Sequence, residues 1–292
     1  MVELKLDFLP SLKKLEDLTK KPWMTSWLSG GYQSLFKGSG IEFDNFSVYT
    51  PEQDSRKIDW KASSKSEKVL VRNYVEERDL KVMLLMDSSN NMLFSSTEVL
   101  KCEYAAELTN SLAFAVVESN DQVSLMMASK DKLKKIPFGS GKKNYFKIIT
   151  ELQTGDNYGS PRDILTSLTN LFKSDDSGLL FIISDFINAS DEELEAISLL
   201  HQKFDIFVFM VRDRMERFLP KDVNAVVFEN MDTGKSIIVN LPEVRSEYIN
   251  HMKKDEARIE SFFLKHDIRF QKFYTHQPYR AKLFQFFEGI GK

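Results

Sequence analysis

Three short, almost entirely apolar runs limit the fold of this chain more than any other sequence feature. They occupy residues 80–86, 178–184 and 205–211 and read LKVMLLM, GLLFIIS and DIFVFMV. Such runs lack the alternation of apolar and polar residues that marks a half-exposed strand, and they are typical of strands buried on both faces of a parallel sheet. Segments with helical spacing of apolar residues separate them. This alternation of strand and helix predicts an α/β fold with a mainly parallel sheet.

The segments between these runs complete the predicted sheet domain. Residues 98–118 place apolar side chains on one helical stripe, which predicts the first crossover helix. Residues 123–128 and 133–138 flank the short polar sequence SKDK, so we expect a hairpin and one antiparallel strand at the sheet edge. Ser190 is placed to cap a helix over 191–202. The other predicted elements are helices near 144–153 and 162–173, a hairpin at 223–240, a helix at 242–265, a strand at 267–274 and a helix after Pro278.

The residues before the first buried run predict a smaller unit. Residues 8–28 carry apolar positions at helical spacing, which indicates a short helix. Residues 38–60 and 69–75 alternate apolar and polar side chains, which indicates a small β unit. We therefore divide the chain into residues 1–78, with a helix and a small β unit, and residues 79–292, the α/β domain, in which 222–241 is a hairpin insertion.

Composition and charge exclude several classes of partner and site. The formal net charge of −3 and the pI near 5.9 give no overall basic field for nucleic acid or an anionic membrane surface. The single cysteine, Cys102, excludes an internal disulfide and a multi-thiolate metal site, and it fits a reducing compartment, so we expect a cytoplasmic protein. No apolar run approaches the roughly 18 residues of a membrane span. The first residues show no signal-peptide core.

Two of the buried runs end in acidic residues, and this is the main functional signal. Asp87, Ser89 and Asn91 follow the first run, and Asp185 follows the second. A doubly wound sheet whose first half ends in an edge hairpin must return to the other side of its first strand. We therefore expect the strand that ends at Asp87 to lie between the hairpin strand and the strand that ends at Asp185. Both aspartates would then meet at the switch point on the carboxyl edge of the sheet.

These side chains could form a site for a hard divalent cation. Alternate residues of an extended segment point the same way, so Asp87, Ser89 and Asn91 could direct oxygen atoms to one point. Magnesium prefers six oxygen ligands and commonly keeps waters, so this set would form an incomplete cage with an open position for a partner's carboxylate. The alternative is that each aspartate only caps the following turn, and the spacing alone favours that simpler interpretation.

The same residues resemble a known motif. The sequence DSSNN at residues 87–91 is similar to the metal-ion-dependent adhesion motif of von Willebrand factor A domains, normally DxSxS, and Asp185 in ISDF looks like the motif's later aspartate. A wider stretch, roughly residues 40–275, resembles the bacterial domain-of-unknown-function family fifty-eight. Its members join a von Willebrand A-like domain to Y-x-P-G-D-D-x-R-x-I-D-W and V-R-x-Y-x-x-E-R segments. The residues that match these segments are Tyr49, Pro51, Asp54, Arg56, Ile58, Asp59, Trp60, Val71, Arg72, Tyr74, Glu77 and Arg78.

The departures from the family pattern concern the metal. Asn91 replaces a serine of the motif, and the family's threonine ligand would fall at Arg162 in the sequence GSPRDIL. An arginine there could take the cation's place and pair with both Asp87 and Asp185, because a guanidinium stays charged and binds carboxylates through two nitrogens. Magnesium and Arg162 are both left open as the balancing cation. We predict weak or absent magnesium binding in the natural protein and a gain of binding in Arg162→Thr, which restores the hydroxyl of the family pattern. The candidate ligands are Asp87, Ser89, Asn91, Ser160 and Asp185, with Arg162 as the alternative cation.

Arg56, Asp59 and Trp60 allow two interpretations. They could form a partner surface, or they could pin the small unit to the sheet domain through an ion pair and a buried ring. We favour the second, because a tryptophan flanked by Ile58 and Ala62 usually packs inward.

The resemblance implies a binding or adaptor protein rather than an enzyme. Family members commonly accompany a MoxR-type AAA+ ATPase, which implies a role in assembling or activating other proteins with that ATPase or its client. The alternative is a magnesium-dependent phosphoryl-transfer or hydrolytic enzyme that uses Asp87 and Asp185. It is weaker because the sequence shows no nucleophile elbow and no HExxH pair. The GKS sequence at 234–236 joins two strand-like runs, whereas a phosphate-binding loop leads into a helix.

Overall fold

The computed structural model describes residues 4–6, 42–50, 55, 58–66, 68–75, 80–219, 223–231 and 233–290. For residues 42–45, 72–75 and 288–290 the description covers the backbone alone. The predicted helix at 8–28 lies outside the described residues, as do Pro51, Asp54, Arg56 and Glu77 of the family segments.

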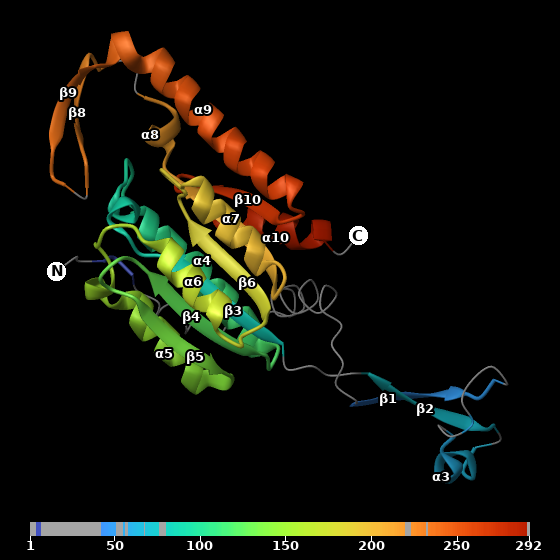
Figure 1. The fold of residues 1–292 in the computed structure, drawn as a ribbon. Helices are drawn as coiled ribbons and strands as arrows, with labels where there is room; N and C mark the ends of the chain where they lie inside the picture. Colours follow the sequence, from blue (N-terminus) through green and yellow to red (C-terminus); the bar gives the residue numbers. More distant parts are fainter. Residues whose placement is uncertain are drawn as a thin grey trace.

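A six-stranded sheet forms the centre of the protein, with the strand order β10-β7-β6-β3-β4-β5. Its strands are β3 (Lys81–Asp87), β4 (Gln122–Ala128), β5 (Lys134–Gly139), β6 (Gly178–Ser184), β7 (Phe204–Arg212) and β10 (Arg269–Tyr274). All neighbours are parallel except β4 and β5, which pair antiparallel at one edge. β3 therefore lies between β4 and β6, as predicted (Figure 1). The predicted doubly wound α/β fold with one antiparallel edge strand is confirmed.

Helices cover both faces of this sheet. α4 (Lys101–Glu118), α5 (Gly141–Gln153) and α10 (Tyr279–Ile290) pack on one face, and α6 (Ile164–Lys173), α7 (Asp191–Leu200) and α9 (Leu241–Lys265) pack on the other. Strand β3 contributes to both cores. Its Val82, Leu84 and Met86 face the first helix layer, and its Met83 and Leu85 face the second. All five side chains are fully buried, which explains why this run is apolar at successive positions.

Short elements connect these layers or lie beside them. Two 3-10 turns, η2 (Asn90–Leu93) and η3 (Gly155–Asn157), and the short helix α8 (Arg214–Arg217) lie in connections of the sheet domain. β1 (Glu42–Val48) and β2 (Leu70–Val75) form one antiparallel pair, with α3 (Trp60–Ser63) between them in sequence. β8 (Ala225–Glu229) and β9 (Ser236–Asn240) form another, so the GKS sequence leads into a strand. Among the described residues, no helix combines the length and the apolar character needed to cross a bilayer.

The family-segment residues Val71, Arg72 and Tyr74 lie in β2, and Tyr49 directly follows β1. The N–H of Tyr49 donates to the carbonyl oxygen of Val69 at 2.8 Å, and Arg72 lies opposite Phe46 in the strand register. The described part of the second family segment therefore supplies β2, and Tyr49 of the first segment adds a backbone hydrogen bond beside it.

Trp60 corrects one expectation from the sequence. Its side chain is 71% exposed, so it does not form the buried ring that we expected. Trp60 begins α3, which Asp59 caps by accepting hydrogen bonds from the N–H groups of Lys61 and Ala62. A helix of four residues, none of them buried, offers no apolar face that the ring could join.

Candidate functional site

The two predicted aspartates lie at the carboxyl edge of the sheet. Asp87 is the last residue of β3, and Asp185 follows the last residue of β6. Because β3 and β6 are parallel neighbours, with Met86 opposite Ile183, both aspartates follow the same end of the sheet. They are buried, with exposed fractions of 1% and 0%. The structure thus brings them to the switch point that the sequence predicts.

Asp87 accepts two hydrogen bonds and faces one cation, each from a different part of the chain. Its Oδ1 accepts the N–H of Ser89 at 2.9 Å, and its Oδ2 accepts the hydroxyl of Ser184 at 2.7 Å. The Nε of Arg162 lies 3.4 Å from the same Oδ2. The carboxylate at the end of β3 therefore meets a cation of the chain itself.

Arg162 lies just before α6 and pairs with Glu193 as well as with Asp87. Its Nη1 is 2.5 Å from Glu193 Oε2, and its Nη2 contacts Oε1, which makes a forked pair. Desolvation opposes the charge of Arg162, but the carboxylates of Glu193 and Asp87 outweigh it and raise the pKa of the guanidinium. Our expectation that Arg162 would pair with both aspartates is corrected. The two terminal nitrogens of its guanidinium pair with Glu193, and Asp185 pairs with Lys101.

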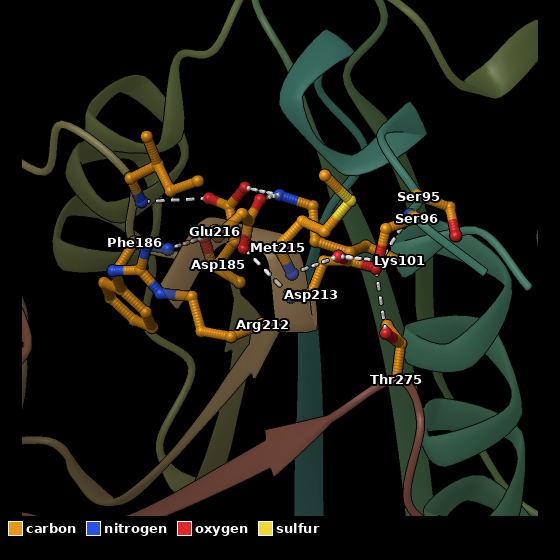
Figure 2. Close-up of polar contacts among 12 residues, drawn as sticks. Ser95, Ser96, Lys101, Asp185, Phe186, Arg212, Asp213, Met215, Glu216 and Thr275 are labelled. Carbon is orange, nitrogen blue, oxygen red and sulfur yellow. Dashed lines mark hydrogen bonds and ion pairs between the residues drawn. The ribbon is translucent and has the colours of Figure 1, made fainter. Parts of the chain in front are cut away.

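Lys101, the first residue of α4, supplies the cation for Asp185. Its Nζ lies 2.5 Å from Asp185 Oδ2 and also contacts Glu216 Oε1 (Figure 2). The lysine is fully buried. Desolvation by itself would lower the pKa of Lys101, but the charges of Asp185 and Glu216 outweigh it, so the pKa is raised. Lys101 is therefore an ammonium group held between two carboxylates.

Glu216 and Arg212 complete this ionic group beyond the end of β7. Glu216 lies on α8, where its Oε2 accepts the N–H of Asp213 in a capping box. Burial raises the pKa of Glu216 despite the nearby charges of Lys101 and Arg212. Burial also opposes the ionisation of Asp185, but Lys101 and then Arg212 outweigh it, so the pKa of Asp185 is lowered. The two carboxylates around Lys101 thus differ, and Asp185 is the more strongly stabilised anion.

The remaining predicted ligands are placed less favourably for a shared ion. The hydroxyl of Ser160 accepts the N–H of Asp131 at 3.1 Å and donates to its Oδ2 at 3.2 Å. Asn91 lies in the 3-10 turn after β3, where the chain has left the extended conformation that would align it with Asp87. Ser89 keeps a buried hydroxyl for which the described residues provide no hydrogen-bond partner.

A magnesium ion does not suit this arrangement. Each carboxylate oxygen of Asp87 and Asp185 already accepts from a donor of the chain, including the N–H of Ile187 on Asp185 Oδ1 at 3.0 Å. Within the described ranges there is no group of three or more His, Cys, Asp or Glu side chains placed to hold a metal. The unpartnered hydroxyl of Ser89 favours an ion, but one hydroxyl is not a cage for a cation that prefers six oxygens.

Sequence reasoning missed Lys101, Glu193 and Glu216. A signal for Lys101 was present, because it lies four residues before Ala105 on the buried stripe of α4. The spacing of Asp213 and Glu216 is that of a capping box, which marks the start of α8 without indicating an ion pair. Glu193 shares the first turn of α7 with two other acidic residues, so the sequence alone does not distinguish it.

Comparison with known proteins gives similar chains in bacteria. "Uncharacterized protein Rv1480" of Mycobacterium tuberculosis (strain ATCC 25618 / H37Rv) and "Uncharacterized protein Mb1516" of Mycobacterium bovis (strain ATCC BAA-935 / AF2122/97) are each 25% identical over 229 residues, which is 77% of this chain and 71% of the relative.

Two solved structures are similar at low identity. An aerotolerance-related membrane protein from Bacteroides fragilis NCTC 9343, with multiple mutations to serines, gives a TM-score of 0.47 at 15% identity and covers 72% of this chain and 99% of that chain. A von Willebrand factor type A structure from Catenulispora acidiphila gives a TM-score of 0.36 at 12% identity and covers 49% of this chain and 35% of that chain.

A family model assigns the chain more directly. The model described as "Protein of unknown function DUF58" matches residues 46–258. This span begins in β1, includes five of the six strands of the central sheet and ends within α9, so both aspartates of the candidate site lie inside it. The match confirms the family that the segments around Tyr49 and Arg72 indicated. The chain belongs to the DUF58 family.

Proposed function

We propose that this protein is a non-catalytic adaptor that binds a protein partner at the carboxyl edge of its central sheet. The observation that carries the proposal is the pairing of each buried aspartate with a cation of the chain: Asp87 with Arg162, and Asp185 with Lys101. A general base or nucleophile must be free to take up a proton or to attack a substrate. Carboxylates held in buried ion pairs balance charge and fix structure, so this edge is suited to contact rather than to turnover.

The connection between β3 and α4 offers apolar side chains to such a partner. It exposes Phe94 and Val99, at 37% and 38%. Ser96 ties the same connection to Asp213 after β7, through its N–H at 3.0 Å and through its hydroxyl (Figure 2). Apolar side chains on an anchored connection lose less conformational entropy on binding than those on a free loop, which favours a preformed contact surface.

As the partner we propose a MoxR-type AAA+ ATPase, or a client protein of that ATPase, in the cytoplasm. Membership of the DUF58 family supports this part of the proposal, because the family resemblance implies an association with such ATPases. The adaptor would then help to assemble or activate the client while the ATPase uses nucleotide. No reactive group of the adaptor itself is required for this role.

Binding to a purified MoxR-type ATPase from the same organism tests the proposal. We expect association, measured by biolayer interferometry, that differs between ATP and ADP. Changing Phe94→Ser together with Val99→Ser should weaken it about tenfold. The matched control is Leu264→Ser. Leu264 is 79% exposed at the end of α9, which leads to the start of β10, so it lies toward the amino ends of the parallel strands and away from the proposed contact surface.

Two results would count against the adaptor proposal. One is equal weakening by the Phe94 and Val99 variant and by the Leu264 control. The other is no association with the ATPase under either nucleotide, together with no capture of the ATPase or a client from native cytosol.

The alternative function, a magnesium-dependent phosphoryl-transfer or hydrolytic enzyme, predicts turnover. A screen of phosphate esters and nucleotides in the presence of magnesium separates the two functions. We expect no turnover above the buffer blank. Robust hydrolysis that Asp87→Ala abolishes would overturn the adaptor proposal in favour of the enzyme.

A further inference from the structure

We infer that Lys101 and Arg162 together take the place of the divalent cation that a motif of this kind holds, so that two internal cations exclude magnesium. Lys101 serves Asp185, and Arg162 serves Asp87. The inference concerns the site alone and does not depend on which partner the protein binds.

Both aspartates share two contacts, although the Oδ2 of Asp87 also accepts the hydroxyl of Ser184. On each, Oδ1 accepts the backbone N–H of the residue two positions later, which is Ser89 for Asp87 and Ile187 for Asp185. On each, Oδ2 faces a side-chain cation, at 3.4 Å for Asp87 and 2.5 Å for Asp185. One cation per aspartate therefore occupies the oxygen that would otherwise be open to a metal.

The ammonium group of Lys101 is held by carboxylates from two other parts of the chain. Lys101 begins α4, whose first turn is held by Glu103, since its Oε2 accepts the N–H of Leu100 at 2.8 Å. The acceptors of Lys101 follow β6 and lie on α8, at sequence separations of 84 and 115 residues. The exposed fraction of Lys101 is 0%. Lys101 therefore cannot exchange Asp185 for water without opening the buried site.

Arg162 is the cation on the Asp87 side of the site. Its side chain is 12% exposed, and the forked pair with Glu193 fixes the plane of its guanidinium. In that position the Nε faces Asp87 Oδ2. Glu193 is anchored in turn, because its N–H donates to the hydroxyl of Ser190 at the start of α7. Arg162 is thus held by carboxylates from two elements, and Lys101 is held in the same way.

Electrostatics opposes magnesium beside the two aspartates. The buried group contains four carboxylates, those of Asp87, Asp185, Glu193 and Glu216, and three cations, Lys101, Arg162 and Arg212, so most of its negative charge is already balanced. Magnesium would add two positive charges next to these fixed cations, and it would need oxygen ligands at about 2.1 Å. The carboxylate oxygens of Asp87 and Asp185 are engaged, so the ion would have to displace Lys101, which is fully buried, and Arg162, which is largely buried.

This arrangement changes what a single substitution can do. Arg162→Thr restores the hydroxyl of the family pattern and frees Asp87, but Lys101 stays on Asp185. Magnesium could then use Asp87 as a ligand but not Asp185. Both cations must be removed before the ion can bridge the aspartates.

Calorimetric titration with magnesium chloride and thermal unfolding at several magnesium concentrations test the inference on the full chain. The opened variant combines Arg162→Thr, Lys101→Met and Glu216→Gln, where the last change removes a carboxylate that would otherwise lose its cation. The matched control combines Arg162→Thr with Lys135→Met and Asp176→Asn, which removes an exposed ion pair of 3.1 Å elsewhere on the surface.

We expect the Tm to be independent of magnesium in the natural protein, in Arg162→Thr alone and in the control. In the opened variant the Tm should rise with the logarithm of the magnesium concentration. An opened variant that folds only when magnesium is added would support the inference in the same way.

Magnesium binding by the natural protein, lost in Asp87→Asn, would overturn the inference. A folded opened variant that gains no more from magnesium than the control would overturn it as well. Because the titration of the natural protein needs no variant, it decides whether magnesium is excluded even where the opened variant does not fold.

Discussion

Replacing Lys101 with methionine should destabilise the protein far more than the loss of an exposed ion pair does. Methionine keeps an unbranched side chain of similar length and is a good helix former, so α4 and its packing are retained. The charge disappears, and Asp185 and Glu216 are left without the cation between them. Their exposed fractions are 0% and 7%, so water does little to replace it.

The expected decrease in the free energy of unfolding follows from this burial. Removing one partner of a buried ion pair costs about 3–5 kcal/mol, because the other charge is left uncompensated. Arg212 also interacts electrostatically with Asp185 and offsets part of the loss, so we expect a value of about 3 kcal/mol, at the lower end of that range. The matched change, Lys135→Met, removes the exposed pair with Asp176 and should cost about 0–1 kcal/mol.

Urea-induced unfolding, followed by circular dichroism at neutral pH, measures both losses. A loss below about 1 kcal/mol for Lys101→Met, or a loss equal to that of Lys135→Met, would refute the reasoning. A second comparison separates charge from packing. Adding Asp185→Asn to Lys101→Met removes an uncompensated carboxylate, so the double variant should regain part of the lost stability.

Three further perturbations probe other buried groups. Arg162→Thr leaves the buried carboxylates of Glu193 and Asp87 without their cation. It should lower the free energy of unfolding by about 2–4 kcal/mol in the same urea assay, whereas a decrease under about 1 kcal/mol would contradict the assigned pairing. Burial opposes the charge of Asp213, but hydrogen bonds from Ser96 outweigh it and lower the pKa, so its stabilisation is present above the unfolded pKa of about 3.9 and is lost as the pH falls through the folded pKa. Asp213→Asn should therefore flatten the acid limb of a Tm-against-pH profile, and an unchanged limb would contradict this. Burial raises the pKa of Cys102 to about 12, so iodoacetamide should label it in urea but not in native buffer, where rapid labelling would be the contrary result.

The central sheet could be predicted because burial on both faces leaves a local trace in the sequence. Strands β3, β6 and β7 are apolar at almost every position, and each is covered by helices on two sides. The polar turn between β4 and β5 marks the antiparallel edge, and winding rules then place β6 on the other side of β3. The proximity of Asp87 and Asp185 followed from that order, because residues after neighbouring parallel strands share one edge.

The ionic contacts could not be predicted in the same way, because they join residues distant in sequence. A lysine at the start of a helix usually reaches water, and nothing near Lys101 indicates acceptors 84 and 115 residues away. The contact of Arg162 with Asp87 was expected. The two terminal nitrogens of the guanidinium, however, pair with Glu193 in the first turn of α7. Trp60 shows the same limit, because its apolar neighbours in sequence do not indicate whether a second layer exists for the ring to pack against.

A site held by internal cations differs from a metal-held site in what can change it. The occupancy of a metal site depends on the ion concentration relative to the dissociation constant, and an open coordination position lets a partner's carboxylate become a ligand. Lys101 and Arg162 are covalently part of the chain, so their charges are present at any ion concentration, and they offer no coordination position. A carboxylate from a partner would meet cations that are already paired, and it would gain little from approaching them. In the proposed adaptor, recognition at this edge would therefore depend on groups that stay exposed, and Phe94 and Val99 on the connection between β3 and α4 are such groups.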